Sequence, residues 1–121
     1  MSTLSSLLIL IVAIEHLYIL WLEMFAWTTH APKVFRNFPK EHFEKTKAMA
    51  ANQGLYNGFL SAGLIWGLML SQPEVSRHVT YFFLSCIVIA GIYGAYSVQR
   101  SIFFVQALPA LLALVLTFLA S

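Results

Sequence analysis

The chain has 121 residues, of which 60% are hydrophobic and 10% are charged. A soluble domain carries about 25% charged residues, so a soluble core of this size could not hide so much apolar surface and we expect lipid to solvate most of it. The formal net charge of +2 gives no reason to expect a nucleic-acid partner, and the single cysteine excludes an internal disulfide.

Four apolar segments are long enough to cross a bilayer, which takes about 20 residues in a helix. The predicted helices cover about residues 4–28, 42–70, 78–98 and 101–119. The first has no basic N-terminal region and no cleavage site, so we interpret it as a helix and not as a signal peptide. Short later connections make consecutive helices antiparallel neighbours. We therefore predict an all-α integral membrane four-helix bundle that forms one domain, residues 1–121.

The basic residues predict the orientation of this bundle. Six of the seven basic residues lie in the first and third connections or in the first turns of the helix that follows, and an even-numbered bundle places these connections on the same side: Lys33, Arg36, Lys40, Lys45, Lys47 and Arg100. Only Arg77 lies in the second connection. Because basic residues accumulate in cytoplasmic loops, this distribution predicts that both termini lie on the outer face of the membrane.

The first helix carries three ionisable side chains within its apolar run, Glu15, His16 and Glu23. Such residues usually face the interior of a bundle or a cavity. His16 and Glu23 are two turns apart and share a face, whereas Glu15 is offset from His16 by about 100°. Two simpler interpretations stay open. His16 is also explained as a neutral histidine bonded inside the bundle, and Glu23 as an interfacial residue that reaches toward the cytoplasm.

The second helix contains the densest polar cluster of the chain, Asn52, Gln53, Tyr56 and Asn57. The cluster overlaps a Gly-x-x-x-Gly motif at Gly54 and Gly58, and the spacing recurs at Gly63 and Gly67. This spacing allows helix backbones to approach closely. One glycine pair would serve the bundle and the other a second copy, so we expect a dimer or trimer. The polar residues are either a ligand site or contacts that hold helices together.

The predicted topology places most polar residues in the cytoplasmic half of the membrane. The candidate pocket residues are His16, Glu23, Asn52, Gln53, Tyr56, Asn57, Tyr93 and Gln106. We expect those of the first two helices to converge on one cavity that opens toward the cytoplasm, with His16 at its floor. The physical reason is that an amide without a partner in hydrocarbon costs several kcal/mol, so each group needs a partner or a wet cavity.

Three functions are compatible with this pattern. The first is a protein that binds or processes a small amphiphile in the pocket. The second is a small proton-coupled transporter of the multidrug type, in which Glu15 carries the proton, and the third is a structural subunit without a ligand. The sequence has no phosphate-binding loop, nucleophile elbow or metal-ligand spacing. It therefore predicts no metal site, identifies no catalytic residue or cofactor, and leaves open whether the protein is an enzyme.

Several stretches resemble the uncharacterised bacterial membrane-protein family catalogued as domain of unknown function 1304. These are residues 15–19, 22–25, 52–60, 90–94 and 106–110. The resemblance implies a compact four-helix protein of the bacterial cell membrane and brings no activity with it. A remoter architectural likeness is to the membrane-associated proteins of eicosanoid and glutathione metabolism, which are trimers that bind glutathione. Residues 48–56 lack the basic and acidic residues of that family's pattern.

Overall fold

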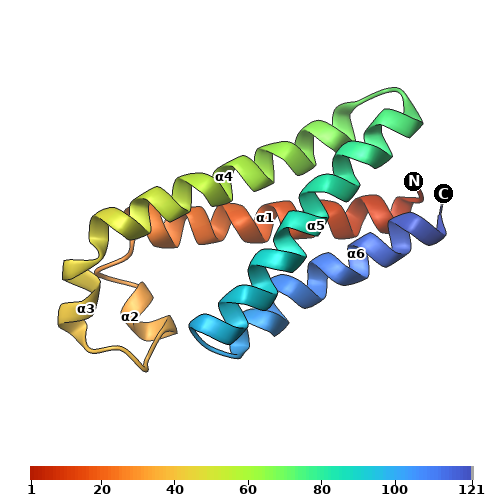
Figure 1. Cartoon of the computed structure of the whole chain (residues 1–121). Helices are drawn as coiled ribbons and strands as arrows, with labels where there is room; N and C mark the ends of the chain where they lie inside the picture. The colour runs from red at the N-terminus through yellow and green to blue at the C-terminus, as the bar shows by residue number, and fades with distance from the viewer. Residues whose placement is uncertain (121) are drawn as a thin grey trace. The chain divides into compact units, whose positions relative to one another are not determined.

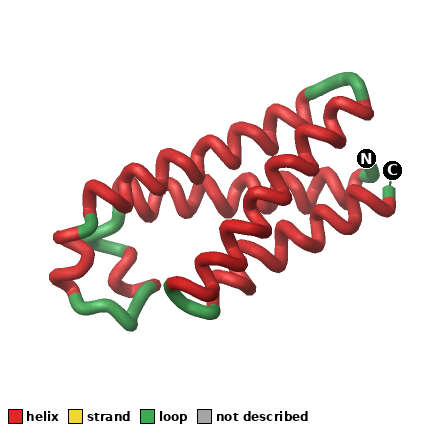
Figure 2. Tube along the Cα trace, viewed as in Figure 1, coloured by secondary structure: helices red, strands yellow, loops and turns green. Residues whose placement is uncertain are grey.

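The computed structural model describes residues 1–120, and every regular element in this range is a helix (Figure 1). The elements are α1 (Thr3–Phe25), α2 (Ala31–Val34), α3 (Lys40–Lys45), α4 (Lys47–Met69), α5 (Pro73–Ser97), the π-helical turn η1 (Phe103–Ala107) and α6 (Leu108–Leu119). Short turns join the helices, and no strand occurs in the described part of the chain (Figure 2). The prediction of an all-α fold is confirmed.

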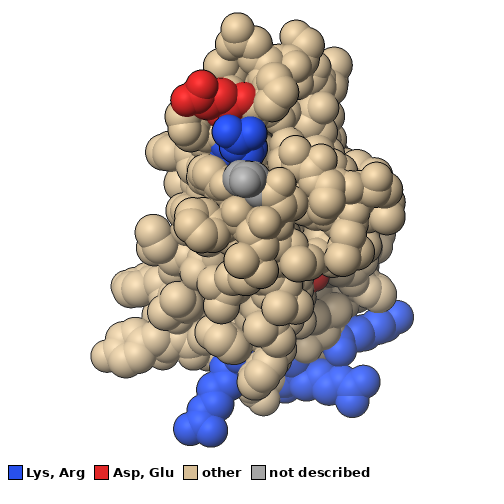
Figure 3. Space-filling model, turned by 90° about the vertical axis from the view of Figure 1, so that its right-hand side faces the viewer, with Lys and Arg blue, Asp and Glu red and all other residues tan. Residues whose placement is uncertain are grey.

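Two helices, α1 and α5, are long and apolar enough to cross a membrane. Only 28% of the apolar stretch of α1 and 22% of that of α5 are buried inside the chain, whereas the core helix of a soluble protein is mostly buried. Residues Phe103–Leu119 form a shorter apolar helix. Figure 3 shows a face of the molecule on which acidic and basic side chains are few. The exposed surface of these helices is therefore of the kind that lipid solvates.

Several helix boundaries differ from the predicted ones. Helix α5 begins at Pro73, several residues earlier than expected, because proline is favoured in a first turn where its missing N–H needs no partner. Its first turn is tied to α4, since the Ser76 hydroxyl donates to the Gly67 carbonyl at 2.6 Å. The predicted second helix is two helices, α3 and α4, separated at Thr46.

The chain divides into two compact units, Ile14–Ser61 and Met1–Ala13 together with the chain from Ala62 onward. In the second of these, the end of α4 packs on α5 through its later glycine pair. A β-carbon on Gly63 would meet the Phe83 ring, and one on Gly67 would lie 2.8 Å from Thr80 Oγ1. This glycine pair is covered within the chain and offers no free face to a second copy.

Helix α5 also packs closely on the η1 turn. A β-carbon on Gly91 would lie 2.6 Å from the Ala107 nitrogen, and one on Gly94 would lie 2.9 Å from Ile102 Cγ2. The π-helical turn comes just before Pro109, which lies in the first turn of α6. Proline has no N–H to donate to the preceding turn, and its ring crowds the carbonyl four residues earlier. A wider π turn at Phe103–Ala107 accommodates this ring.

Candidate functional site

In the unit Ile14–Ser61, the second half of α1 and the first half of α4 lie side by side (Figure 1). The earlier glycine pair of α4 faces α1. A β-carbon on Gly54 would lie 2.6 Å from Met24 Cγ and 3.1 Å from the Leu20 carbonyl oxygen, and one on Gly58 would lie 2.7 Å from Leu20 Cδ1. The missing side chains let the two backbones approach. Both glycine pairs of α4 are thus used inside the chain, and the expectation that one of them serves a partner is corrected.

Asn57 lies between these helices and bonds directly to α1. Its Nδ2 atom donates to Glu23 Oε1 at 2.6 Å and to the Gln53 carbonyl, one turn earlier on α4, at 3.2 Å. Asn57 is only 8% exposed, and Glu23 is partly exposed. Within residues 1–120, Asn57 is the only hydrogen-bond or ion-pair partner of the Glu23 side chain. The bond is short, as expected where the acceptor is a carboxylate.

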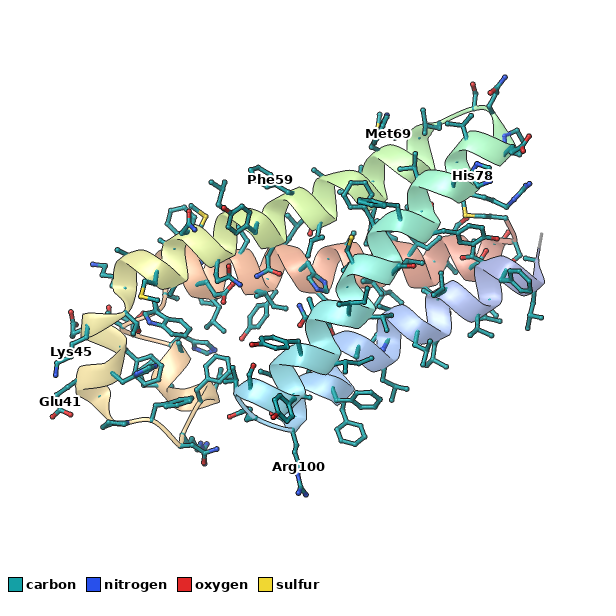
Figure 4. All side chains as sticks on the ribbon, viewed as in Figure 1. Glu41, Lys45, Phe59, Met69, His78 and Arg100 are labelled. Atoms are coloured by element: carbon teal, nitrogen blue, oxygen red, sulfur yellow. The ribbon has the colours of Figure 1, made fainter. Side chains whose placement is uncertain are left out.

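The other predicted residues of α4 do not meet Glu23. Asn52, Gln53 and Tyr56 are exposed, and the Tyr56 ring packs on the Phe59 ring of the same helix, with the ring centroids 5.9 Å apart. Figure 4 shows Phe59 pointing outward from α4. Because each residue is rotated by about 100° from the previous one, Asn52 falls on the side of α4 away from Asn57, and Tyr56 is turned by about 100° from it. Of the predicted residues of α4, Asn57 is the one that the structure joins to Glu23 by a hydrogen bond.

His16 is fully buried, two turns before Glu23 on α1. Its Nδ1 atom lies 3.9 Å from Oε1 of the neighbouring Glu15, which is too far for a hydrogen bond. The Glu15 side chain is 25% exposed, and its Oε1 atom is buried without a hydrogen-bond partner among the described residues. Two carboxylates and one imidazole thus lie along the second half of α1.

The last two predicted residues belong to the other unit. Tyr93 is exposed on α5 and, with Ile89, Ile92 and Tyr96, lines a shallow groove of about 440 Å³. The spacing of these four residues places them along one side of α5. Apart from the tyrosine hydroxyls the lining of this open groove is apolar. Gln106 lies in the η1 turn and is partly exposed.

One folded feature was missed. Residues 26–47, which span the predicted first connection at about 29–41, form what we call the aromatic cap. Its core contains Ala26, Ala31 and Phe43 with Leu22 of α1, and three partly buried rings pack against that core, Trp27, Phe35 and Phe38. The short helix α3 lies within the cap. The four aromatic residues of this segment were the sequence signal for a folded element, because a solvated loop does not require aromatic side chains.

Comparison with known proteins agrees with the resemblance described above. Residues 10–118 match the model of the family described as "Protein of unknown function (DUF1304)". The "Uncharacterized protein YpaA" of Lactococcus lactis subsp. lactis (strain IL1403) is 32% identical over 120 residues, which cover 98% of this chain and 99% of that protein. No solved structure matches the chain. The predicted family assignment is confirmed, and the chain belongs to the DUF1304 family.

Proposed function

We propose that the chain is a four-span membrane protein that binds or processes a small amphiphile at Glu23 and Asn57. The observation that carries this proposal is the hydrogen bond between these two side chains. An ionised carboxylate offers about four acceptor sites, and in the described chain Asn57 occupies one of them. A ligand with N–H or O–H donors in its head group would satisfy the remaining sites, and its apolar tail would lie along the exposed apolar helices.

The proposed orientation of the protein in the membrane is inferred from the positions of its basic residues. Both termini lie outside the bacterial cell membrane, and the aromatic cap lies in the cytoplasm. Glu23 is two residues from the end of α1 that leads into the cap, so the site opens toward the cytoplasm, with His16 deeper in the membrane. Four short helices enclose little volume, and we therefore also propose that the protein is a homo-oligomer, a dimer or a trimer.

Cysteine labelling tests this orientation. Thr3→Cys and Asn37→Cys are made in a Cys86→Ser background, because Cys86 is a free thiol and both new positions are exposed. We expect a membrane-impermeant maleimide to label position 3 in intact cells and position 37 only after permeabilisation. Gln72→Cys, in the exposed second connection, is the control and should behave as position 3 does. Labelling of position 37 in intact cells would refute the orientation.

Native mass spectrometry of protein extracted gently from its own membrane tests the ligand. We expect a copurifying small molecule with the wild type and its loss in Glu23→Gln. Glutamine keeps an oxygen that accepts from Asn57 but loses the charge, so the helix pair should persist. Glu15→Gln is the matched control, since it removes the other carboxylate of α1, and it should retain the molecule. The same spectra give the number of copies in the oligomer.

The outcomes separate the three functions. Loss of the copurifying molecule in Glu23→Gln alone supports the binding site. Loss of that molecule in Glu15→Gln alone would favour the proton-coupled transporter. No copurifying molecule in any variant, together with unchanged oligomers, would favour a structural subunit. We rank the transporter second because the Glu15 side chain is three-quarters buried, which gives less support to a cavity shared between copies.

A further inference from the structure

The aromatic cap is a folded element with its own internal bonds. The Trp27 ring centroid lies 5.2 Å from that of Phe43 and 5.8 Å from that of Phe35. The Trp27 indole N–H donates to Thr46 Oγ1 at 3.0 Å, and the Thr46 hydroxyl donates in turn to the His42 carbonyl at 2.7 Å. These contacts hold both ends of the cap together. Side chains that project from such a core are presented in a defined arrangement, at a lower entropic cost than those of a free loop.

The cap carries most of the positive charge of the chain. Five of the seven basic residues fall between positions 33 and 47, against two acidic residues in the same stretch, Glu41 and Glu44, which gives a net charge of +3. All five basic side chains are exposed. None of them makes an ion pair with another described residue, and Figure 4 shows Glu41 and Lys45 both pointing outward from α3. The positive charge is therefore available to a partner.

The residues that border the cap indicate which partner it meets. Phe25, the last residue of α1, and Met49, in the first turn of α4, are each 72% exposed. Large apolar side chains exposed to this extent on apolar helices fit the hydrocarbon layer, and the cap begins immediately beyond them. This is the level at which lipid head groups lie, and where tryptophan is favoured because its ring is apolar and its N–H is polar.

We infer that the aromatic cap binds anionic phospholipid head groups through Lys33, Arg36, Lys40, Lys45 and Lys47. This inference rests on the membrane placement in the proposed function, but not on a ligand at Glu23. Each basic residue close to an anionic membrane surface contributes about 1 kcal/mol. That energy corresponds to about a fivefold preference per residue for an anionic over a zwitterionic lipid.

The test uses the full chain in nanodiscs made from a mixture of phosphatidylglycerol and phosphatidylcholine. Native mass spectrometry measures the ratio of the two lipids that stay bound after delipidation. We expect enrichment of phosphatidylglycerol over its share in the nanodisc, and a loss of this enrichment of about fivefold for each cation removed in Lys33→Gln, Arg36→Gln and Lys40→Gln. High salt should reduce the enrichment in the wild type.

Two controls make the outcome specific. Arg77→Gln with Arg100→Gln removes the two basic residues that lie outside the cap, each of them distant in the sequence from other cations, and should lower the enrichment less than the loss of two cap cations does. The double variant Lys33→Arg with Lys40→Arg keeps both positive charges and should leave the enrichment unchanged. Equal retention of the two lipids by the wild type, or the same loss in the Arg77 and Arg100 variant, would overturn the inference while leaving the binding site at Glu23 standing. Failure of the wild type to enter nanodiscs would overturn both proposals.

Discussion

Alanine at position 91 is expected to lower the free energy of unfolding by about 2 kcal/mol. Gly91 of α5 is buried against the η1 turn, where an added β-carbon would lie 2.6 Å from the Ala107 nitrogen and 2.8 Å from its Cα. These are backbone atoms and cannot rotate away, so the two helices must separate. Overpacking of this kind costs about 1–3 kcal/mol. The higher helix propensity of alanine, about 1 kcal/mol, offsets only part of the cost.

Gly58→Ala is the matched control for this substitution. The nearest atom to its new β-carbon would be the terminal Leu20 Cδ1 at 2.7 Å, and the next nearest would lie 3.9 Å away. Because a leucine side chain can adopt another rotamer, we expect a change within about 0.5 kcal/mol. Unfolding by sodium dodecyl sulfate in mixed micelles measures both variants. An equal loss of stability in the two would mean that α5 and the η1 turn are not packed as closely as described.

Leucine at position 57 is expected to cost about 2 kcal/mol of stability, because it removes the only described donor to the Glu23 carboxylate. Asn57 and Glu23 join α4 to α1 through a single bond of 2.6 Å. A partly buried carboxylate left without a donor loses more free energy than the bond itself contributed. Asn52→Leu is the control, since Asn52 lies on the same helix and is exposed. It should change stability by less than about 0.5 kcal/mol.

A double-mutant cycle isolates this pair. Replacing both partners with apolar residues removes the unmatched group as well as the bond, which is often close to neutral. We therefore expect Glu23→Leu with Asn57→Leu to cost less than the sum of the single variants by about 1.5 kcal/mol. The free energies come from the same micelle titration. A coupling energy near zero would show that the two side chains do not interact in the folded protein.

The sequence by itself determined the helical class, the two apolar helices that are long enough to cross a membrane, and the family. Long runs such as Thr3–Phe25 can satisfy their backbone groups in an apolar solvent only by forming helices, so composition and length were enough. Glu23 and Asn57 also stood out in the sequence, because a carboxylate and an amide are rare in apolar helices. The close packing of α4 could be predicted from its glycine spacing. A glycine has no side chain to keep a neighbouring helix away, whichever helix that neighbour is.

Only the tertiary structure decided which groups meet. The rotation of α4 about its axis, set by Gly54 and Gly58 against Leu20, turns Asn57 toward Glu23 and leaves Tyr56 exposed. Such a rotation depends on contacts between residues more than thirty positions apart, which no local pattern contains. The aromatic cap likewise depends on a contact between residues that are far apart in the sequence. Trp27 and Thr46 are 19 residues apart, and their bond forms only once the ends of α1 and α4 have been brought together.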